Sequence, residues 1–101
     1  MMEKQQIIKH LENFPLYSQD GKGYDAQVKI IFSLLGTRNK WYITEGSERD
    51  NDFIMFGYVQ LLTGELGYIS LNELLNLDMG VLSVEFINDD LKLSDIIENH
   101  A

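Results

Sequence analysis

Apolar side chains recur along the chain with two different periods, and each period predicts a different kind of element. Glu3–Asn13 carries apolar residues at helical spacing, which predicts a short amphipathic helix that ends before Pro15. Ala26–Leu35 alternates apolar and polar residues, which is typical of a strand with one buried face. One predicted face of this strand carries Val28, Ile30, Phe32 and Leu34, and the other carries Gln27, Lys29, Ile31 and Ser33.

Three more strand-forming segments follow at close spacing. Trp41–Thr44 consists of strong strand formers. Phe53–Leu62 is apolar on both faces, which predicts a central strand covered on both sides. Gly67–Ile69 is predicted to be a short strand after a tight turn. Because the connections between these segments are short, antiparallel hairpins are favoured over parallel crossovers.

The rest of the chain adds two helices and one strand. Ser70–Glu73 reads S-L-N-E, a capping box in which the serine hydroxyl accepts from the Glu73 amide and the Glu73 carboxylate reaches back. Leucines at helical spacing continue this helix over residues 71–77. Val81–Ile87 reads as a strand, and Ser94 is predicted to cap a last helix over Asp95–His100.

These elements predict an α+β fold in one domain over residues 1–101. Its antiparallel sheet would have about four to five strands, with an N-terminal helix, a capped helix and a short C-terminal helix on at least one face. The absence of cysteine excludes disulfides, thiolate metal sites and cysteine nucleophiles. The N-terminus lacks the apolar core of a signal peptide, and the longest apolar run is about half the length of a membrane helix. We therefore expect a cytoplasmic protein with no membrane partner.

Charge is distributed unevenly along the chain. The net charge is −8, but residues 1–49 hold seven cations and six acids, whereas residues 50–101 hold one cation and ten acids. The second half would repel phosphate backbones and attract a basic protein surface. Direct nucleic-acid binding is therefore not expected, and solubility is the simpler interpretation of the acids.

The segment Thr44–Phe53, T-E-G-S-E-R-D-N-D-F, concentrates four acids around one arginine. Three interpretations are ranked in order: a solvated hairpin loop, part of an acidic binding face, and a Mg²⁺ or Mn²⁺ site made by Glu45, Asp50 and Asp52. The third requires Glu45 to end one strand and Asp52 to begin the next, so that the two face each other across a hairpin mouth.

Aromatic and acidic side chains outside the core are candidates for a protein interface. The candidate protein-binding residues are Tyr17, Trp41, Glu48, Asp50, Asp52, Tyr68, Asp89 and Asp90. The two histidines, His10 and His100, lie at opposite ends of the chain and are weak evidence for zinc or a general base. The sequence thus predicts no catalytic residue and no cofactor.

Four ordered blocks resemble a known bacterial family. L-Y-S-Q-D at Leu16–Asp20, W-Y-I-T-E at Trp41–Glu45, D-F-I-M-F-G-Y-V at Asp52–Val59 and E-L-G-Y-I-S-L-N-E-L at Glu65–Leu74 are similar to the domain of unknown function 2958 family. The chain departs from the family pattern at Met55-Phe56, where Phe-Phe is usual, and at Ile69, where Phe is usual. The resemblance implies a small stand-alone domain carried on plasmids, phages and other mobile elements. It implies no established reaction, cofactor or catalytic residue.

Charge, aromatic content and this resemblance lead to one functional hypothesis and one alternative. The hypothesis is a non-enzymatic protein-binding accessory module of a mobile genetic element, which acts on an unidentified protein partner through an acidic and aromatic surface. Its sharpest version is a nucleic-acid-mimicking inhibitor of a host enzyme. The alternative is a small metal-dependent hydrolase that uses Glu45, Asp50 and Asp52.

Overall fold

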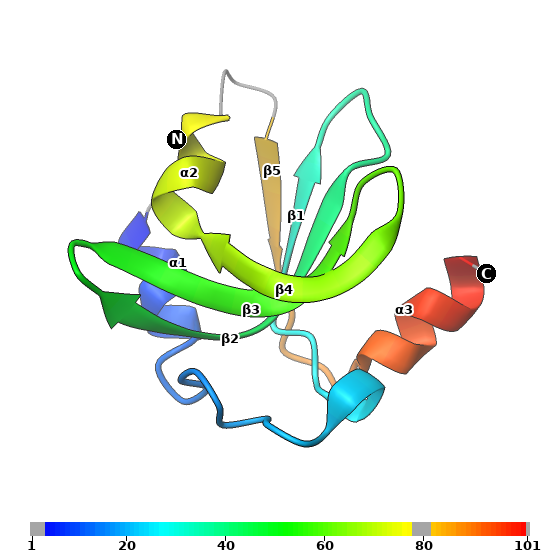
Figure 1. Cartoon of the computed structure of the whole chain (residues 1–101), viewed down its shortest axis with the longest axis horizontal. Helices are drawn as coiled ribbons and strands as arrows, with labels where there is room; N and C mark the ends of the chain where they lie inside the picture. Colours follow the sequence, from blue (N-terminus) through cyan, green and yellow to red (C-terminus); the bar gives the residue numbers. More distant parts are fainter. Residues whose placement is uncertain (1–3, 78–81, 101) are drawn as a thin grey trace.

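The protein is an antiparallel sheet with helices on both faces (Figure 1). The computed structural model describes residues 4–77 and 82–100, with side chains up to Ile97 in the last helix. The elements are α1 (Lys4–His10), η1 (Gly23–Asp25), β1 (Ile30–Leu34), β2 (Lys40–Arg49), β3 (Asp52–Gln60), β4 (Gly64–Ser70), α2 (Leu71–Asn76), β5 (Leu82–Phe86) and α3 (Leu93–His100).

The sheet has five strands in the order β4-β3-β2-β1-β5, and every pairing is antiparallel. The first four strands are joined in sequence by tight turns, while β5 returns after α2 and pairs with the outer edge of β1. The predicted α+β class and the predicted hairpins are therefore confirmed. In Figure 1, α1 and α2 lie on the left, and α3 lies on the right, at the opposite side of the molecule.

Alternation along the strands gives the sheet two apolar faces. The larger core lies on the side of α1 and α2, and it includes Ile7, Leu11, Phe32, Trp41, Met55 and Leu74. The smaller core lies on the side of α3, and it includes Ala26, Val28, Tyr42, Ile87, Leu93 and Ile96. β3 is an interior strand that contributes to both faces, as its two-sided apolar pattern predicted.

A β-bulge in β2 shapes the face that carries the smaller core. The pairing with β3 shifts between Ile43 and Glu45, so Thr44 is an extra residue without an opposite partner. The extra residue brings Thr44 and Glu45 onto the same face as Phe56. Gly57 lies opposite the shift, and a Cβ there would collide with the carbonyl oxygen of Tyr42. The bulge therefore requires glycine in the F-G-Y-V segment.

The predicted strand over Ala26–Leu35 begins only at Ile30. Before Ile30, successive backbone amides donate to different segments of the chain. The Val28 amide donates to the Leu91 carbonyl at 2.7 Å, and the Lys29 amide donates to the Ile43 carbonyl at 2.8 Å. Regular alternation fails there. Val28 packs in the smaller core, away from Ile30, and Lys29 is buried instead of facing water.

The two predicted helix caps have different outcomes. The Ser70 hydroxyl accepts from the Glu73 amide at 3.1 Å, as predicted for α2. Ser94, in contrast, lies inside the first turn of α3, which begins two residues earlier than a Ser94 cap would allow. The carboxylate of Asp95 accepts from the Lys92 amide at 3.1 Å and takes the capping role. The predicted boundaries at Glu3 and Val81 lie outside the described residues.

Candidate binding pocket

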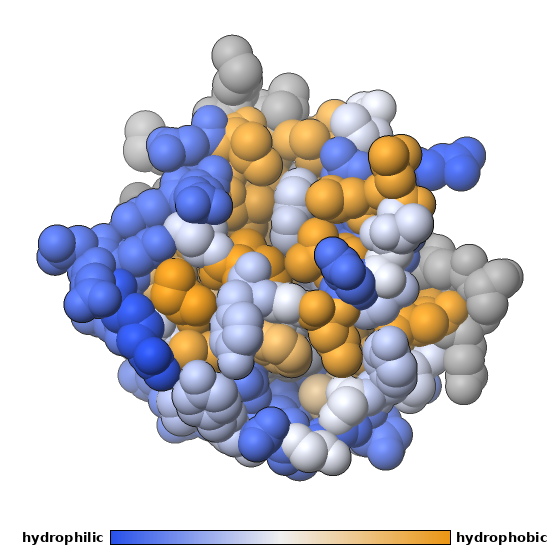
Figure 2. Space-filling model, viewed as in Figure 1, coloured by the Kyte–Doolittle hydropathy of each residue, from blue (hydrophilic) through white to orange (hydrophobic). Residues whose placement is uncertain are grey.

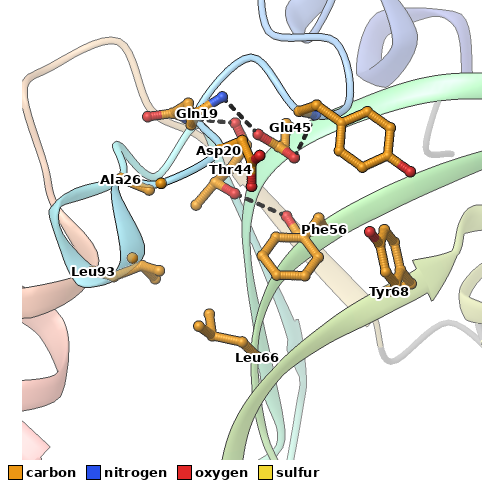
Figure 3. Close-up of a pocket in the computed structure, with 12 residues that line it drawn as sticks. Gln19, Asp20, Ala26, Thr44, Glu45, Phe56, Leu66, Tyr68 and Leu93 are labelled. Atoms are coloured by element: carbon orange, nitrogen blue, oxygen red, sulfur yellow. Dashed lines mark hydrogen bonds between the residues drawn. The ribbon is translucent and has the colours of Figure 1, made fainter.

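A buried carboxylate fastens the loop after α1 to the sheet. Glu45 is 5% exposed, and its two oxygens accept hydrogen bonds from the backbone amides of Tyr17 at 2.8 Å and Gln19 at 2.9 Å (Figure 3). Charge-assisted bonds of this kind are stronger than neutral ones. The L-Y-S-Q-D and W-Y-I-T-E blocks therefore meet in space, and Glu45 is a structural partner of the loop.

The Gln19 side chain completes this attachment. Its amide nitrogen donates to the carbonyl oxygens of Thr44 at 2.7 Å and Gln27 at 3.0 Å, and its oxygen accepts from the Gln27 amide at 2.7 Å. The side chain is 6% exposed, and these three bonds satisfy its polar atoms without water. Gln19 and Glu45 together make a rigid polar wall at the bulge of β2.

A pocket of about 360 Å³ lies against this wall, between the loop, strands β2 to β4 and the start of α3. Figure 3 shows Phe56 and Tyr68 extending from β3 and β4 toward the pocket, with Leu66 beneath them. We call it the acidic–aromatic pocket; its lining includes Tyr17, Asp20, Glu45, Phe56, Leu66 and Tyr68. The rings of Phe56 and Tyr68 meet edge to face, with centroids 5.1 Å apart.

The acidic–aromatic pocket is electronegative. Asp20 and Glu45 supply carboxylates, and none of the described lining residues is lysine, arginine or histidine. A hydrogen bond with Tyr17 and burial raise the pKa of Tyr68, and the charges of Glu45 and Asp20 raise it further. Tyr68 is therefore neutral at pH 7, and the pocket suits a cation.

Tyr17 holds its place at an energetic cost. Its φ is +75°, in the left-handed region that residues with a side chain rarely adopt, and this costs about 1–2 kcal/mol. The ring gains little burial in return, because the residue is 56% exposed. Glycine would fit the turn without strain. Strained residues of this kind cluster at functional sites, so the Tyr17 ring is a candidate for ligand contact.

The proposed metal cluster does not form. β2 continues through Glu45 to Arg49, so Glu45 pairs with Phe56 while Arg49 pairs with Asp52. Asp50 lies in a two-residue turn with positive φ, which replaces the expected solvated loop. Glu45 therefore does not face Asp52 across a hairpin mouth. Among the described residues, no three His, Cys, Asp or Glu side chains are placed to hold a metal ion.

Asp52 joins β3 to α2. Its carboxylate accepts from the Ser70 hydroxyl, from the Phe53 amide at 2.7 Å and from the Asn72 amide at 3.1 Å. Burial alone would raise the pKa of this carboxyl, but the three hydrogen bonds outweigh burial and lower it, with help from the charge of Lys4. Asp52 is thus a structural acid at the start of a helix.

The other predicted interface residues do not converge on one surface. Tyr17 and Tyr68 share the acidic–aromatic pocket, which also brings in Glu45. Trp41 does not join them, because its side chain is 7% exposed and packs in the larger core.

The predicted interface acids occupy two segments that lie apart in Figure 1. Glu48 and Asp50 are exposed at the β2–β3 turn, whereas Asp89 and Asp90 are exposed between β5 and α3. Of the two histidines, His10 bonds the Ile87 carbonyl at 3.1 Å, and the side chain of His100 lies outside the described residues.

Comparisons with models of protein families, with curated proteins and with solved structures give no match. The resemblance to the domain of unknown function 2958 family therefore stays a prediction from the sequence blocks. No helix within residues 4–77 and 82–100 has the length and apolar character needed to span a membrane.

Proposed function

We propose that this protein is a non-enzymatic protein-binding module whose acidic–aromatic pocket receives a lysine or arginine side chain of its partner. Cations are attracted both to carboxylates and to the faces of aromatic rings, and this pocket offers Asp20, Glu45 and three rings. The observation that carries the proposal is Tyr17, an exposed residue kept in a strained backbone conformation at a pocket whose described lining residues include no cation.

The sequence resemblance supplies the proposed setting, a mobile genetic element, with a host or element-encoded protein as the partner. The described acids favour a local pocket over mimicry of a nucleic acid. A mimic needs one contiguous acidic face, whereas the acids at the β2–β3 turn and those after β5 lie apart (Figure 1). The alternative of a metal-dependent hydrolase loses its support, since Glu45 and Asp52 are bound in separate hydrogen-bond groups.

The direct test is a titration of isotope-labelled protein with capped Gly-Lys-Gly peptide, followed by amide chemical shifts. We expect shifts at Gln19, Asp20 and Tyr68, which weaken as salt rises. The peptide that carries acetyl-lysine, which lacks the charge, should bind at least about tenfold more weakly.

A pair of variants locates the binding. Tyr68→Ala removes a ring that is 60% exposed, so it should abolish binding without unfolding the protein. Tyr24→Ala is the matched control, because Tyr24 is similarly exposed but does not line the pocket. Equal binding of the charged and acetylated peptides, or equal effects of the two variants, would refute the proposal.

A further inference from the structure

A second pocket, separate from the first, contains a buried lysine whose ammonium group has no acid partner among the described residues. The pocket measures about 580 Å³ and shares no residue with the acidic–aromatic pocket. We call it the basic pocket; its lining includes Lys9, His10, Phe14, Lys29, Phe86 and Asn88. It lies between α1, the residues that follow α1, and the end of β5.

Lys29 is the central feature of the basic pocket. It is 8% exposed, yet among the described residues no carboxylate or carbonyl oxygen bonds its ammonium group. The ammonium nitrogen lies over the ring of Phe14, 4.8 Å from the ring centroid. A lysine residue is rarely buried this deeply without a paired acid. The Lys29 ammonium group has no such acid among the described residues, and an anion in the pocket would supply one.

The backbone holds Lys29 in this position. Its amide donates to the Ile43 carbonyl, and its carbonyl accepts from the Ile87 amide, both at 2.8 Å. The side chain is therefore directed by a segment fixed on two sides and not by a flexible loop. Since no fully buried side-chain nitrogen lacks a hydrogen bond in the described part of the chain, the ammonium group must open toward the pocket.

The surroundings favour an anion with an apolar body. Lys9 adds a second cation, against one carboxylate, Glu12, among the described lining residues. This local excess of positive charge occurs in a protein whose net charge is −8. Phe14 and Phe86 supply apolar surface, and His10 packs its ring edge to face on Phe86, with centroids 5.0 Å apart.

We infer that the basic pocket binds a small organic acid, with the carboxylate at Lys29 and an aromatic or short apolar body against Phe14 and Phe86. The simpler interpretation is a lysine whose stem is buried while its charged end remains hydrated. The two interpretations differ in whether a carboxylate binds saturably and in a manner that depends on Lys29.

The experiment uses benzoate as the probe and benzamide, its uncharged counterpart, as the control ligand. Benzoate should shift the amide signals of His10, Lys29 and Asn88 saturably, with a Kd on the order of 1 mM, as expected for a ligand of this size. Benzamide and acetate should each bind at least about tenfold more weakly, because one lacks the charge and the other lacks the ring.

Variants assign the effect to Lys29. Lys29→Met has nearly the same shape, and it should lower benzoate affinity at least about tenfold while the amide spectrum stays folded. Lys9→Met, on the more exposed surface of α1, should lower it less, and Lys22→Met, an exposed lysine outside the pocket, should leave it unchanged. Absence of a saturable shift, equal binding of benzamide, or full binding by Lys29→Met would each overturn the inference.

Discussion

Glu45 and Lys29 are charged side chains withdrawn from water to a similar extent, yet their surroundings differ completely. Glu45 is 5% exposed and accepts two backbone hydrogen bonds, whereas Lys29 is 8% exposed and contacts one aromatic ring. A buried charge is stable when internal groups replace its lost hydration. Glu45 meets this condition within the fold. The ammonium group of Lys29 opens toward its pocket, so it depends on water or on a ligand there.

The comparison distinguishes two roles. Glu45 shapes a binding site by holding a loop in place, whereas Lys29 is itself the proposed binding group. Glu45 positions the loop that carries Tyr17 and thereby shapes the acidic–aromatic pocket. Removal of Glu45 should therefore damage the fold first and binding second. Removal of Lys29 should damage binding alone. The predictions below test this division from the largest expected change in stability to the smallest.

Glu45→Leu should have the largest effect. Leucine leaves the amides of Tyr17 and Gln19 without acceptors, and each unsatisfied buried amide costs about 1–3 kcal/mol. We expect a loss of about 3–5 kcal/mol in the free energy of unfolding, measured by urea denaturation. Glu48→Leu is the matched control on the same strand, because Glu48 is exposed and should change stability by less than about 0.5 kcal/mol. Similar losses in the two variants would show that Glu45 does not anchor the loop.

Asp52→Asn should have a smaller effect that depends on pH. Asparagine keeps an acceptor for the Phe53 amide but loses the charge and the acceptor for the Ser70 hydroxyl, so we expect a loss of about 1–2 kcal/mol at pH 7. The folded pKa of Asp52 lies below its unfolded value, which is about 3.9. The stabilisation is therefore complete above the unfolded pKa and is lost as pH falls through the folded pKa.

Urea denaturation of Asp52→Asn and of the unaltered protein checks this expectation. The measurements span roughly pH 2 to 7, a range that includes the titration of carboxyl groups. The difference in stability between the two proteins should be constant near neutral pH and should shrink in acid. A difference that stays constant down to the lowest pH would mean that the charge of Asp52 contributes nothing.

The sequence predicted the elements better than the contacts between them. The α+β class, the hairpins and the Ser70 cap follow from local patterns, and the structure confirms them. The role of Glu45 depends on the loop at Tyr17 and on the bulge at Thr44, and neither leaves a periodic signal. The close spacing of the acids therefore predicts a solvated hairpin loop, part of an acidic face or a metal cluster, although β2 runs through Glu45 and Glu48 to Arg49.

Lys29 was missed for a related reason. Strict alternation places it on a polar face, together with Gln27 and Ser33, where a lysine is expected to be hydrated. The chain exchanges bonding partners just before Ile30, and an irregular segment does not keep the two-residue period. Long-range hydrogen bonds of this kind are set by tertiary structure, and a single sequence does not reveal them.

Tyr17→Gly should separate the backbone of Tyr17 from its ring. Glycine keeps the amide that Glu45 binds and adopts a φ of +75° without strain. Its unfolded chain is more flexible, however, so the variant loses more conformational entropy on folding. We expect stability to change by less than about 1 kcal/mol, while binding of the lysine peptide is lost. Tyr17→Ala is the control, since it removes the same ring but keeps the strain, and it should be less stable than the glycine variant. An alanine variant at least as stable as the glycine variant would contradict the strain at Tyr17.

Lys29→Met should have the smallest effect on stability and the clearest effect on binding. The lost cation–π contact is worth about 0.5–2 kcal/mol, but methionine no longer requires a hydrated charge at a buried position, and the two changes nearly cancel. Thermal unfolding without ligand should therefore shift by only a few degrees, in either direction. With benzoate above its Kd, the unaltered protein should gain thermal stability by mass action, and the Lys29→Met variant should gain clearly less.

Lys40→Met serves as the control for a lysine that lies outside the basic pocket, and benzoate should stabilise this variant as much as the unaltered protein. If Lys29→Met instead unfolded as readily as Glu45→Leu, both buried charges would be structural, and the distinction drawn between them would fail. If it were stable but stabilised by benzoate as much as the unaltered protein, the ligand would bind elsewhere. Only a stable variant with a clearly weaker response to the carboxylate fits a lysine whose partner comes from outside the fold.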